Sequence, residues 1–277
     1  MIQSNYPLKN ISTIGLGGIC KEFICPTSID ELLKIKFTKK KLFIGNGSNI
    51  CFITDYYDGT IVSLKRMNKE MSHDDKYIYC SSNISCTKIA RYLFNNSISG
   101  FEYLYGIPGT IGGALYMNAG AFDKEILSHV HRIKLLDHNG DLYYLKGKDL
   151  NYSYRRSNIN KSSIIIGVEF YNHTKIFDKK LLSNLDNKRK SSQPVNQLSC
   201  GCIFKNPPHK YASKLIEGAK LKGKRFGGIY ISRKHSNYFI NDGSGSFTDF
   251  LNLLDYVKRK VLSVYNIELK EEVILIK

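Results

Sequence analysis

Apolar residues in the last third of the chain recur at the spacing of a helix. From Asp249 to Tyr265 they stand three or four positions apart, which predicts an amphipathic helix with one face in a core. A hydroxyl side chain can accept a hydrogen bond from the first turn of a helix, so we expect Thr248 to cap this one. Further helices are predicted at residues 29–33 (capped by Ser28), 87–95, 175–189 and 210–219.

Short runs rich in β-branched and aromatic residues predict strands between these helices. The run at 162–170 is β-branched enough to lie inside a sheet. Asn139-Gly140 separates two such runs, and Asn-Gly in that position predicts a hairpin. The remaining predicted strands cover residues 23–25, 42–44, 60–64, 77–80, 131–137, 142–145, 229–231, 238–240 and 272–276.

One stretch, residues 100–125, is dense in glycine. Without side chains, its backbone N–H groups could approach a bulky anion closely. Residues 114–117 can wind a helical turn whose unpaired N–H groups and dipole point back at the glycines. The stretch is therefore either a cradle for a pyrophosphate or a tight turn between packed elements. Its key residues are Gly106, Gly109, Gly112 and Gly113 around Pro108.

A second glycine cluster follows the predicted strand at 42–44. The end of a strand that supplies small polar groups and backbone donors is a plausible second wall of the same site. Neither cluster has the spacing of a Rossmann or Walker motif. The cluster reads Gly45-Asn46-Gly47-Ser48-Asn49.

The two clusters resemble the flavin-binding motifs of the UDP-N-acetylenolpyruvoylglucosamine reductase family, FAD enzymes of bacterial cell-wall precursor synthesis. Further similar blocks follow in the family's order, so the resemblance covers nearly the whole chain. The second motif reads Gly106-Ile107-Pro108-Gly109-Thr110-Ile111-Gly112-Gly113-Ala114 with Met117-Asn118-Ala119-Gly120-Ala121. The later blocks are Tyr154-Arg155-Arg156-Ser157, Gln193-Pro194, Gly201–Pro207, Leu215-Ile216-Glu217, Lys234-His235-Ser236-Asn237 and Glu272-Val273.

The resemblance implies an α+β fold, with a two-part FAD-binding region of the vanillyl-alcohol-oxidase/PCMH type and a C-terminal α+β substrate-binding domain. We expect FAD-binding subdomains at residues 1–66 and 67–174 and the substrate-binding domain at 175–277. The short interval between Ser157 and Gln193 implies the shorter subclass of the family. The implied FAD contacts are Gly45, Asn46, Gly47, Ser48, Asn49, Gly106, Ile107, Pro108, Gly109, Thr110, Gly112, Gly113, Asn118, Gly120 and Ala121.

The reaction that the resemblance implies starts with a hydride that passes from NADPH to FAD. FAD then reduces the vinyl group of UDP-N-acetylglucosamine enolpyruvate, which yields UDP-N-acetylmuramate. Hydride addition drives negative charge toward the adjacent carboxylate. The site must therefore stabilise an enediolate and protonate the neighbouring carbon.

Three residues match the family's catalytic positions. Arg155 can stabilise the carboxylate with a planar, permanently charged guanidinium, and Glu272 can donate a hydrogen bond to it if burial keeps it neutral. Cys202 stands where most relatives have a serine that donates the proton. A thiol is a far stronger acid than an alcohol, so we predict that Cys202 is the donor. The implied substrate contacts are Tyr154, Lys205, Asn206, His235 and Asn237.

Each of the three also has an ordinary interpretation: a surface arginine, a buried structural cysteine, and a charged glutamate beside Glu271. A slip of one residue would exchange Glu272 for Glu271. The chain departs from the family at Asp123 and Lys220, where relatives often have glycine. These departures concern the rim of the site more than its centre.

The chain is strongly basic, with 41 Lys and Arg against 24 Asp and Glu, a formal charge of +17. Codon bias in an AT-rich genome or phosphate-bearing ligands could explain this charge. The lysines are scattered and no nucleic-acid-binding motif is present, so we expect no nucleic-acid partner. A basic nucleic-acid-binding protein and another FAD-linked oxidoreductase on the same scaffold remain the alternatives.

Seven cysteines without a Cys-x-x-Cys pair do not indicate a disulfide framework or a metal site. Cys200 and Cys202 with His209 lack a fourth ligand at zinc spacing, so we expect no metal. No apolar run approaches the ~20 residues needed to span a bilayer, and no export signal is visible. We expect a cytoplasmic monomer without a membrane partner.

Overall fold

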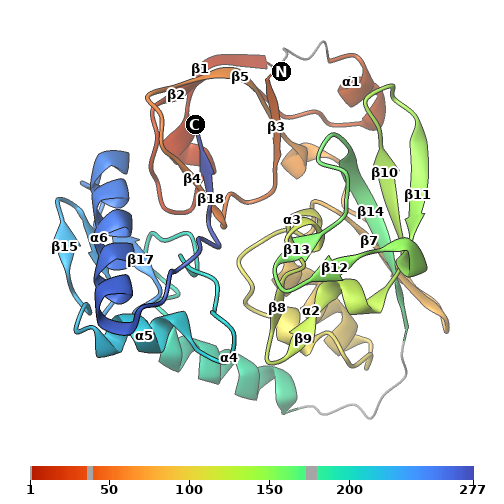
Figure 1. The fold of residues 1–277 in the computed structure, drawn as a ribbon. Helices are drawn as coiled ribbons and strands as arrows, with labels where there is room; N and C mark the ends of the chain where they lie inside the picture. The colour runs from red at the N-terminus through yellow and green to blue at the C-terminus, as the bar shows by residue number, and fades with distance from the viewer. Residues whose placement is uncertain (1, 36–39, 173–179) are drawn as a thin grey trace. The chain divides into compact units, whose positions relative to one another are not determined.

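The computed structural model describes residues 2–35, 40–172 and 180–277, and Figure 1 shows its helices and strands. The chain divides into two compact units. The first unit comprises Ile24–Gly45 and Ile61–Lys188 with Ile2, and the second comprises Gln3–Phe23, Asn46–Thr60 and Arg189–Lys277. Each unit contains both helices and strands, as the α+β prediction requires. The predicted boundaries at residues 66 and 174 stay a prediction.

The first unit is built around a five-stranded sheet with the order β11-β10-β14-β7-β6. All its pairings are antiparallel. The predicted hairpin is confirmed, because β10 and β11 pair across the Asn139-Gly140 turn. The strands are β6 (Met71–His73), β7 (Tyr77–Ser81), β10 (Val130–Leu136), β11 (Leu142–Lys146) and β14 (Ile164–Tyr171).

Helices α2 (Cys86–Asn95) and α3 (Ile111–Tyr116) share a core with this sheet. Ser85 caps α2, since its hydroxyl accepts a hydrogen bond from the N–H of Lys88 at 3.2 Å. The apolar face of α2, predicted from its period, is buried at Ile89 and Leu93 against Ile78 of β7. The glycine-rich stretch connects these two helices and is therefore anchored at both ends.

A smaller core in the first unit contains Leu32 of α1 (Ile29–Leu33), Val62, Leu136 and Ile164. Helix α1 has the predicted bounds. Its predicted cap is confirmed too, because the Ser28 hydroxyl accepts from the Glu31 N–H at 3.1 Å. A four-stranded sheet has the order β1-β2-β5-β3. Its strands are β1 (Ile2–Pro7), β2 (Ile19–Ile24), β3 (Lys41–Ile44) and β5 (Tyr56–Ser63).

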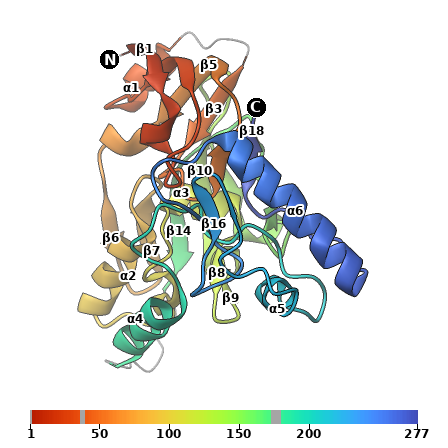
Figure 2. The same ribbon diagram turned by 90° about the vertical axis from the view of Figure 1, so that its left-hand side faces the viewer.

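The second unit packs α5 (Ala212–Gly218) and α6 (Phe247–Tyr265) on a three-stranded antiparallel sheet, β15-β16-β17. Figure 2 shows α6 as the long helix of this unit. The C-terminal strand β18 pairs in parallel with β4. The strands are β4 (Ile50–Phe52), β15 (Arg225–Phe226), β16 (Ile229–Ile231), β17 (Phe239–Asn241) and β18 (Ile274–Ile276).

The predicted cap of the long helix is wrong. Helix α6 begins at Phe247, and Ser246 caps it in a capping box with Asp249. The Ser246 hydroxyl accepts from the Asp249 N–H at 3.0 Å, and the Asp249 carboxylate accepts from the Ser246 N–H at 2.9 Å. This reciprocal pair satisfies two N–H groups that Thr248, already inside the first turn, does not reach.

The polar helix predicted at 175–189 is α4 (Leu181–Ser192), and its predicted start lies outside the described residues. The prediction of a strand through residue 64 is also wrong, because β5 ends at Ser63 and a 3-10 turn begins at Leu64. The short pairs are β8 (Gly120–Ala121) with β9 (Lys124–Glu125) and β12 (Tyr152–Ser153) with β13 (Arg156–Ser157). The 3-10 helices are Leu8–Ile11, Leu64–Arg66, Glu102–Leu104, Ile126–His129 and Gly147–Asp149. Among the described residues, no helix is both long and apolar enough to cross a bilayer.

Candidate active site

The loop after β3 presents backbone N–H groups in succession. Within the described chain, the N–H groups of Asn46, Gly47 and Ser48 donate to no acceptor. Gly47 has a positive φ of 66°, and a Cβ there would lie 2.0 Å from the carbonyl oxygen of Ile11. Only glycine fits this turn. Successive N–H groups in such a turn form a concavity that binds anions.

The second glycine stretch uses its N–H groups differently. The N–H of Ile111 donates to the Ile84 carbonyl, and that of Gly112 donates to the Ser82 carbonyl, both at 2.8 Å. The Gly113 N–H donates to the hydroxyl of Thr110, the N-cap of α3, at 3.4 Å. The prediction that this helix presents unpaired N–H groups is therefore wrong at its first three positions. These N–H groups, which were expected to bind an anion, instead form hydrogen bonds that hold the stretch to the rest of the first unit.

The two glycine clusters meet within the first unit at one point. A Cβ on Gly45 would lie 2.3 Å from the hydroxyl oxygen of Thr110, so a side chain at Gly45 would displace the cap of α3. A Cβ on Gly112 would lie 3.0 Å from the Cβ of Ser82, whereas one on Gly113 would come no closer than 3.6 Å to any atom. Gly45 and Gly112 are thus required by packing, and Gly113 is not.

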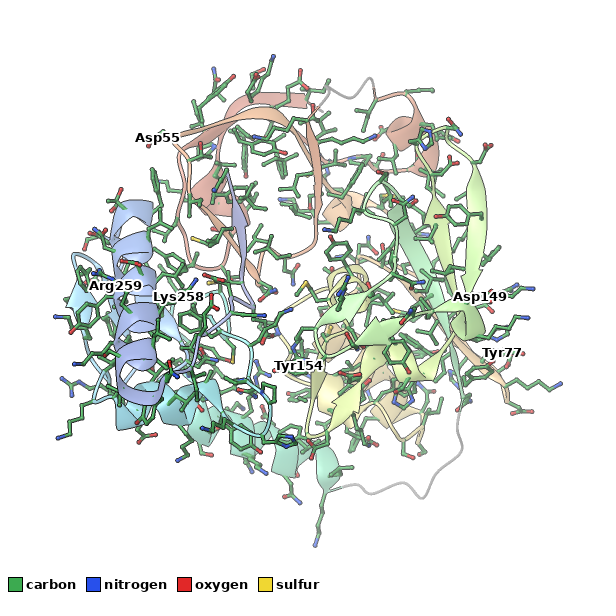
Figure 3. The ribbon with its side chains drawn as sticks, viewed as in Figure 1. Asp55, Tyr77, Asp149, Tyr154, Lys258 and Arg259 are labelled. Atoms are coloured by element: carbon green, nitrogen blue, oxygen red, sulfur yellow. The ribbon has the colours of Figure 1, made fainter. Side chains whose placement is uncertain are left out.

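Arg155 lies in the tight turn of the β12–β13 hairpin, next to Tyr154; Figure 3 labels Tyr154. Its φ of 55° is unusual for a residue with a side chain. Its guanidinium donates to the carbonyl of Gly120 at 3.0 Å and stacks 4.8 Å from the Tyr154 ring centre. The buried Asn118 holds the hairpin, because its amide donates to the Ser153 carbonyl at 3.0 Å. The predicted flavin residues Asn118 and Gly120 therefore position the predicted catalytic arginine.

A cavity of about 360 Å³ lies in the first unit between the start of α1, the loop after β5 and the end of β7. Asn83 lines it and is 9% exposed; its amide NH₂ donates to the carbonyls of Leu64 and Met67 at 3.0 and 2.8 Å. Among the residues that the structure describes, none donates a hydrogen bond to the amide oxygen of Asn83. A buried acceptor without a donor is costly, so this oxygen indicates a missing partner with an N–H or O–H group. The neighbouring Ser82 also lines the cavity, and its carbonyl accepts the hydrogen bond from the N–H of Gly112.

The second unit brings Cys202 and Glu272 onto neighbouring segments. The Glu272 N–H donates to the carbonyl of Ile203, the residue after Cys202, at 2.8 Å. Cys202 also forms an isolated antiparallel bridge with Tyr238, whose hydroxyl donates to the side-chain oxygen of Gln193 at 3.0 Å. Gly201 makes the turn before Cys202 with a φ of 77°. Two of the three predicted catalytic residues are thus close neighbours in one unit.

The two adjacent glutamates differ in their surroundings. Glu271 forms an ion pair with Lys258 of α6 at 2.7 Å, and Figure 3 labels Lys258 on that helix. The backbone of Glu272 accepts a hydrogen bond from the amide of Asn49 at 3.1 Å. Asn49, predicted to contact the flavin, therefore anchors the segment that carries Glu272.

Three of the predicted substrate contacts have structural partners inside the second unit. The Asn237 side chain bonds both the N–H and the carbonyl of Phe204, at 3.0 and 2.8 Å. The Asn206 side chain accepts from the N–H of Ala212, the first residue of α5, at 3.0 Å. Burial lowers the pKa of His235, whose ring nitrogen accepts from the Asn237 N–H at 3.3 Å. Lys205 is half-buried, and no ion pair holds its ammonium group within the described residues.

The cysteines separate clearly by burial. Six of the seven are buried thiols, and Cys202 is the one that is only partly buried. Burial raises the pKa of Cys51 to about 12 and also raises that of Cys200, so neither is a ready acid. The described residues contain no group of three or more His, Cys, Asp or Glu side chains that could hold a metal ion.

Comparison with known families defines the class of the protein. A family described as "FAD binding domain" matches residues 21–146, which include both glycine clusters. A second, described as "UDP-N-acetylenolpyruvoylglucosamine reductase, C-terminal domain", matches residues 193–276, which include Cys202 and Glu272. The chain is therefore a FAD-binding flavoprotein with an additional C-terminal domain, and the predicted fold class is confirmed.

Similar proteins cover the chain from end to end. The UDP-N-acetylenolpyruvoylglucosamine reductase of Caldanaerobacter subterraneus subsp. tengcongensis is 35% identical and aligns with 97% of this chain and 91% of its own. That of Fusobacterium nucleatum subsp. nucleatum is 31% identical over 100% and 99%. The crystal structure of the Thermus caldophilus reductase has a TM-score of 0.82 at 28% identity, over 100% of this chain and 98% of that one. This chain belongs to the UDP-N-acetylenolpyruvoylglucosamine reductase family.

Two features of the site escaped the sequence interpretation. Tyr238 was predicted only as part of a strand, yet it lies opposite Cys202 in an antiparallel bridge. Asn83 carried no motif at all, and only its unpaired oxygen in the folded chain distinguishes it. The bridge between Cys202 and Tyr238 joins residues that are far apart in the chain, so no local sequence pattern predicts it.

Proposed function

We propose that this chain reduces UDP-N-acetylglucosamine enolpyruvate to UDP-N-acetylmuramate, with FAD as cofactor and NADPH as reductant. The observation that supports it best is the pairing of a partly exposed thiol with a glutamate: Cys202 and Glu272 lie on adjacent segments of the second unit. A vinyl ether conjugated to a carboxylate needs an acid for its carbon and a donor for its carboxylate. We expect the protein to act as a monomer in the cytoplasm.

The residues present fit FAD. The N–H groups of Asn46, Gly47 and Ser48 suit the oxygens of its pyrophosphate, because they are consecutive and unpaired within the described chain. The cavity beside Ser82 has a volume within the roughly 300–1,000 Å³ of small-molecule sites. We assign it to the adenosine end, whose amino and hydroxyl groups can donate to the Asn83 oxygen. Bound there, FAD would supply the chemistry of hydride transfer from NADPH to the vinyl group.

Arg155 is assigned to the substrate carboxylate. The carbonyl of Gly120 and the Tyr154 ring hold its guanidinium in one orientation, so little rotamer freedom remains to be lost on binding. A fixed positive charge of this kind stabilises the negative charge that develops on the carboxylate during hydride addition. Arg155 itself has a positive φ, and strained backbone of this kind is often found at functional residues.

Cys202 is assigned as the acid that protonates the carbon next to the carboxylate. The thiol proton moves to that carbon, and the S–H bonding electrons stay on sulfur as a thiolate, which solvent then reprotonates. Glu272 is assigned as a carboxylic acid that donates a hydrogen bond to the substrate carboxylate. Glu271 is a poor alternative, since it is engaged with Lys258.

The test is rapid mixing of a Cys202→Ala variant. Flavin reduction by NADPH should stay within twofold of the wild type, while reoxidation by the enolpyruvyl substrate should slow by about 10²–10⁴-fold, the usual contribution of a general acid. Cys200→Ala is the matched control, because it removes a neighbouring thiol that lies in the core. Cys202→Ser should retain part of the activity. Normal reoxidation of Cys202→Ala would refute the assignment.

A further inference from the structure

The Tyr238 hydroxyl has a hydrogen-bond partner in the second unit, and a thiol lies opposite the residue. Tyr238 is 8% exposed and lies opposite Cys202 in an antiparallel bridge. Its hydroxyl donates to the side-chain oxygen of Gln193 at 3.0 Å, and the Cys202 thiol is near enough to affect its pKa. A phenol has one proton and two lone pairs. While the phenol proton points at Gln193, the lone pairs of the phenol oxygen remain available to accept from the thiol S–H.

The charged and titratable groups around this hydroxyl come from several segments. Arg189 lies toward the end of α4, Glu272 precedes β18, and the ring of His235 lies edge-on to the Tyr238 ring with centroids 4.9 Å apart. Burial is the largest effect and raises the pKa of Tyr238, with Cys202 and Glu272 acting in the same direction and Arg189 opposing them. Tyr238 therefore stays protonated at neutral pH and is a hydrogen-bond donor rather than a base.

We propose that Tyr238 is a positioning residue for Cys202: it fixes the thiol and, once the thiol proton has left, turns its own proton from Gln193 to the sulfur. This inference rests on the proposed role of Cys202 as the acid. No proton is lost from the phenol in this step. The thiol proton goes to the substrate carbon, the electron pair stays on sulfur, and the phenol hydrogen bond stabilises the resulting thiolate.

A purely structural tyrosine would not need the neighbouring thiol of Cys202, which lies opposite it in the bridge. The bond to Gln193 alone satisfies a buried hydroxyl, and the ring could fill its space as phenylalanine. A hydrogen bond from the phenol to the sulfur would act on the acidity of Cys202, because such a bond is stronger for the thiolate than for the thiol.

The experiment compares Tyr238→Phe with the wild-type holoenzyme by the pH dependence of alkylation with iodoacetamide. Only the thiolate reacts, and Cys202 is the one incompletely buried cysteine. We expect Tyr238→Phe to raise the midpoint of the profile by about one pH unit and to lower the rate at pH 7 about tenfold, since hydrogen bonds to charged groups are that strong. Substrate-driven reoxidation should slow with it, and flavin reduction by NADPH should not change. Cys202→Ala supplies the blank.

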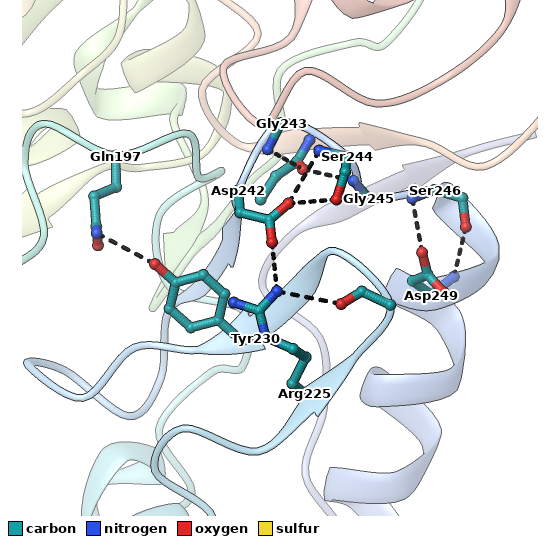
Figure 4. Close-up of polar contacts among 11 residues, drawn as sticks. Gln197, Arg225, Tyr230, Asp242, Gly243, Ser244, Gly245, Ser246 and Asp249 are labelled. Carbon is teal, nitrogen blue, oxygen red and sulfur yellow. Dashed lines mark hydrogen bonds and ion pairs between the residues drawn. The ribbon is translucent and has the colours of Figure 1, made fainter.

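Tyr230→Phe is the matched control. It makes the same substitution in β16, which pairs with the strand that follows Tyr238, on a tyrosine whose hydroxyl accepts a hydrogen bond from Gln197 at 3.3 Å; Figure 4 shows this pair. Its alkylation profile should equal that of the wild type. Gln193→Ala tests the proposal independently of the folding of Tyr238→Phe, because removal of the competing acceptor should move the midpoint downward.

An unchanged alkylation profile in a folded Tyr238→Phe protein would overturn the proposal, as would a shifted profile with normal reoxidation. Alkylation needs no substrate, so these results are separate from the proposed function. Normal reoxidation of the Cys202→Ala variant would show that Cys202 is not the acid. If the proposal for Tyr238 is overturned, the assignment of Cys202 as the acid is unaffected.

Discussion

Two glycine-rich loops of this protein look alike in sequence and differ in how their donors are used. In the loop Gly45–Asn49, three successive N–H groups have no acceptor within the described chain. In the stretch 106–113, the N–H groups of Ile111, Gly112 and Gly113 are all paired inside the first unit. A high glycine content therefore marks where the backbone is tightly packed, and only the fold decides which donors stay available for an anion.

A third loop, Asn241–Gly245, sharpens this contrast, and Figure 4 shows it. The side-chain oxygen of Asn241 accepts from the N–H groups of Gly243 and Gly245, at 2.9 and 3.0 Å. The Asp242 carboxylate accepts from the N–H of Ser244 at 3.0 Å and from its hydroxyl at 2.7 Å. This loop satisfies its own donors with its own side chains, so we assign it a structural role.

The largest effect is expected from Gly47→Ala. The new Cβ would meet the Ile11 carbonyl at 2.0 Å, and the residue would keep a positive φ, so we expect a loss of about 3 kcal/mol in the free energy of unfolding. Gly243→Ala is the control, because its φ is 103° with nothing within 4 Å of the added carbon. Urea unfolding of the apoproteins measures both. Equal losses would show that the close approach to Ile11 contributes nothing.

Gly113→Ala should produce a smaller effect of opposite sign in the apoprotein. Nothing within 3.6 Å opposes the added carbon, and alanine is the better helix former by about 1 kcal/mol. We expect the apoprotein to gain up to that amount and FAD to bind at least about tenfold more weakly, because glycine here serves the approach of a ligand. Flavin fluorescence titration gives the affinity. Unchanged FAD binding would mean that the second stretch does not contact the cofactor.

The smallest effect is expected in the stability of the protein at low pH, through the loop Asn241–Gly245. Hydrogen bonds from Ser244, together with Arg225, lower the pKa of Asp242 to about 2. The folded-state pKa lies below its usual value, so this contribution to stability is complete above about pH 4 and is lost as the pH falls toward 2. Asp242→Asn should lower stability modestly at neutral pH, where this contribution is complete, and flatten the decline in stability over that interval. Acid titrations of the melting temperature that coincide for both proteins would contradict it.

Much of the fold was predictable, because local chemistry fixes it. Ser28 and the apolar period of 29–33 determine α1, and Asn139-Gly140 determines the turn between β10 and β11. Thr248 is a residue type that often caps a helix, but the reciprocal spacing of Ser246 and Asp249 sets the start of α6. The three-residue strands β4 and β6 carry too few residues for a period to show.

The site was less predictable because its parts depend on pairings between distant segments. The motifs located Cys202 and Glu272, but their closeness follows from the hydrogen bond between Glu272 and Ile203. Asn237 and Asn206 were predicted to contact substrate, and the folded chain occupies both side chains with backbone groups. Whether a polar side chain is available to bind a ligand depends on the fold. The spacing of residues in the sequence does not show it.

The central claim is that the flavin of this protein passes electrons from NADPH to the enolpyruvyl substrate. The most direct test is an anaerobic cycle followed by flavin absorbance. One equivalent of NADPH should bleach the oxidised spectrum, and UDP-N-acetylglucosamine enolpyruvate should restore it with one equivalent of UDP-N-acetylmuramate formed. A flavin that stays reduced after addition of this substrate, and is reoxidised only by oxygen or another acceptor, would contradict the account.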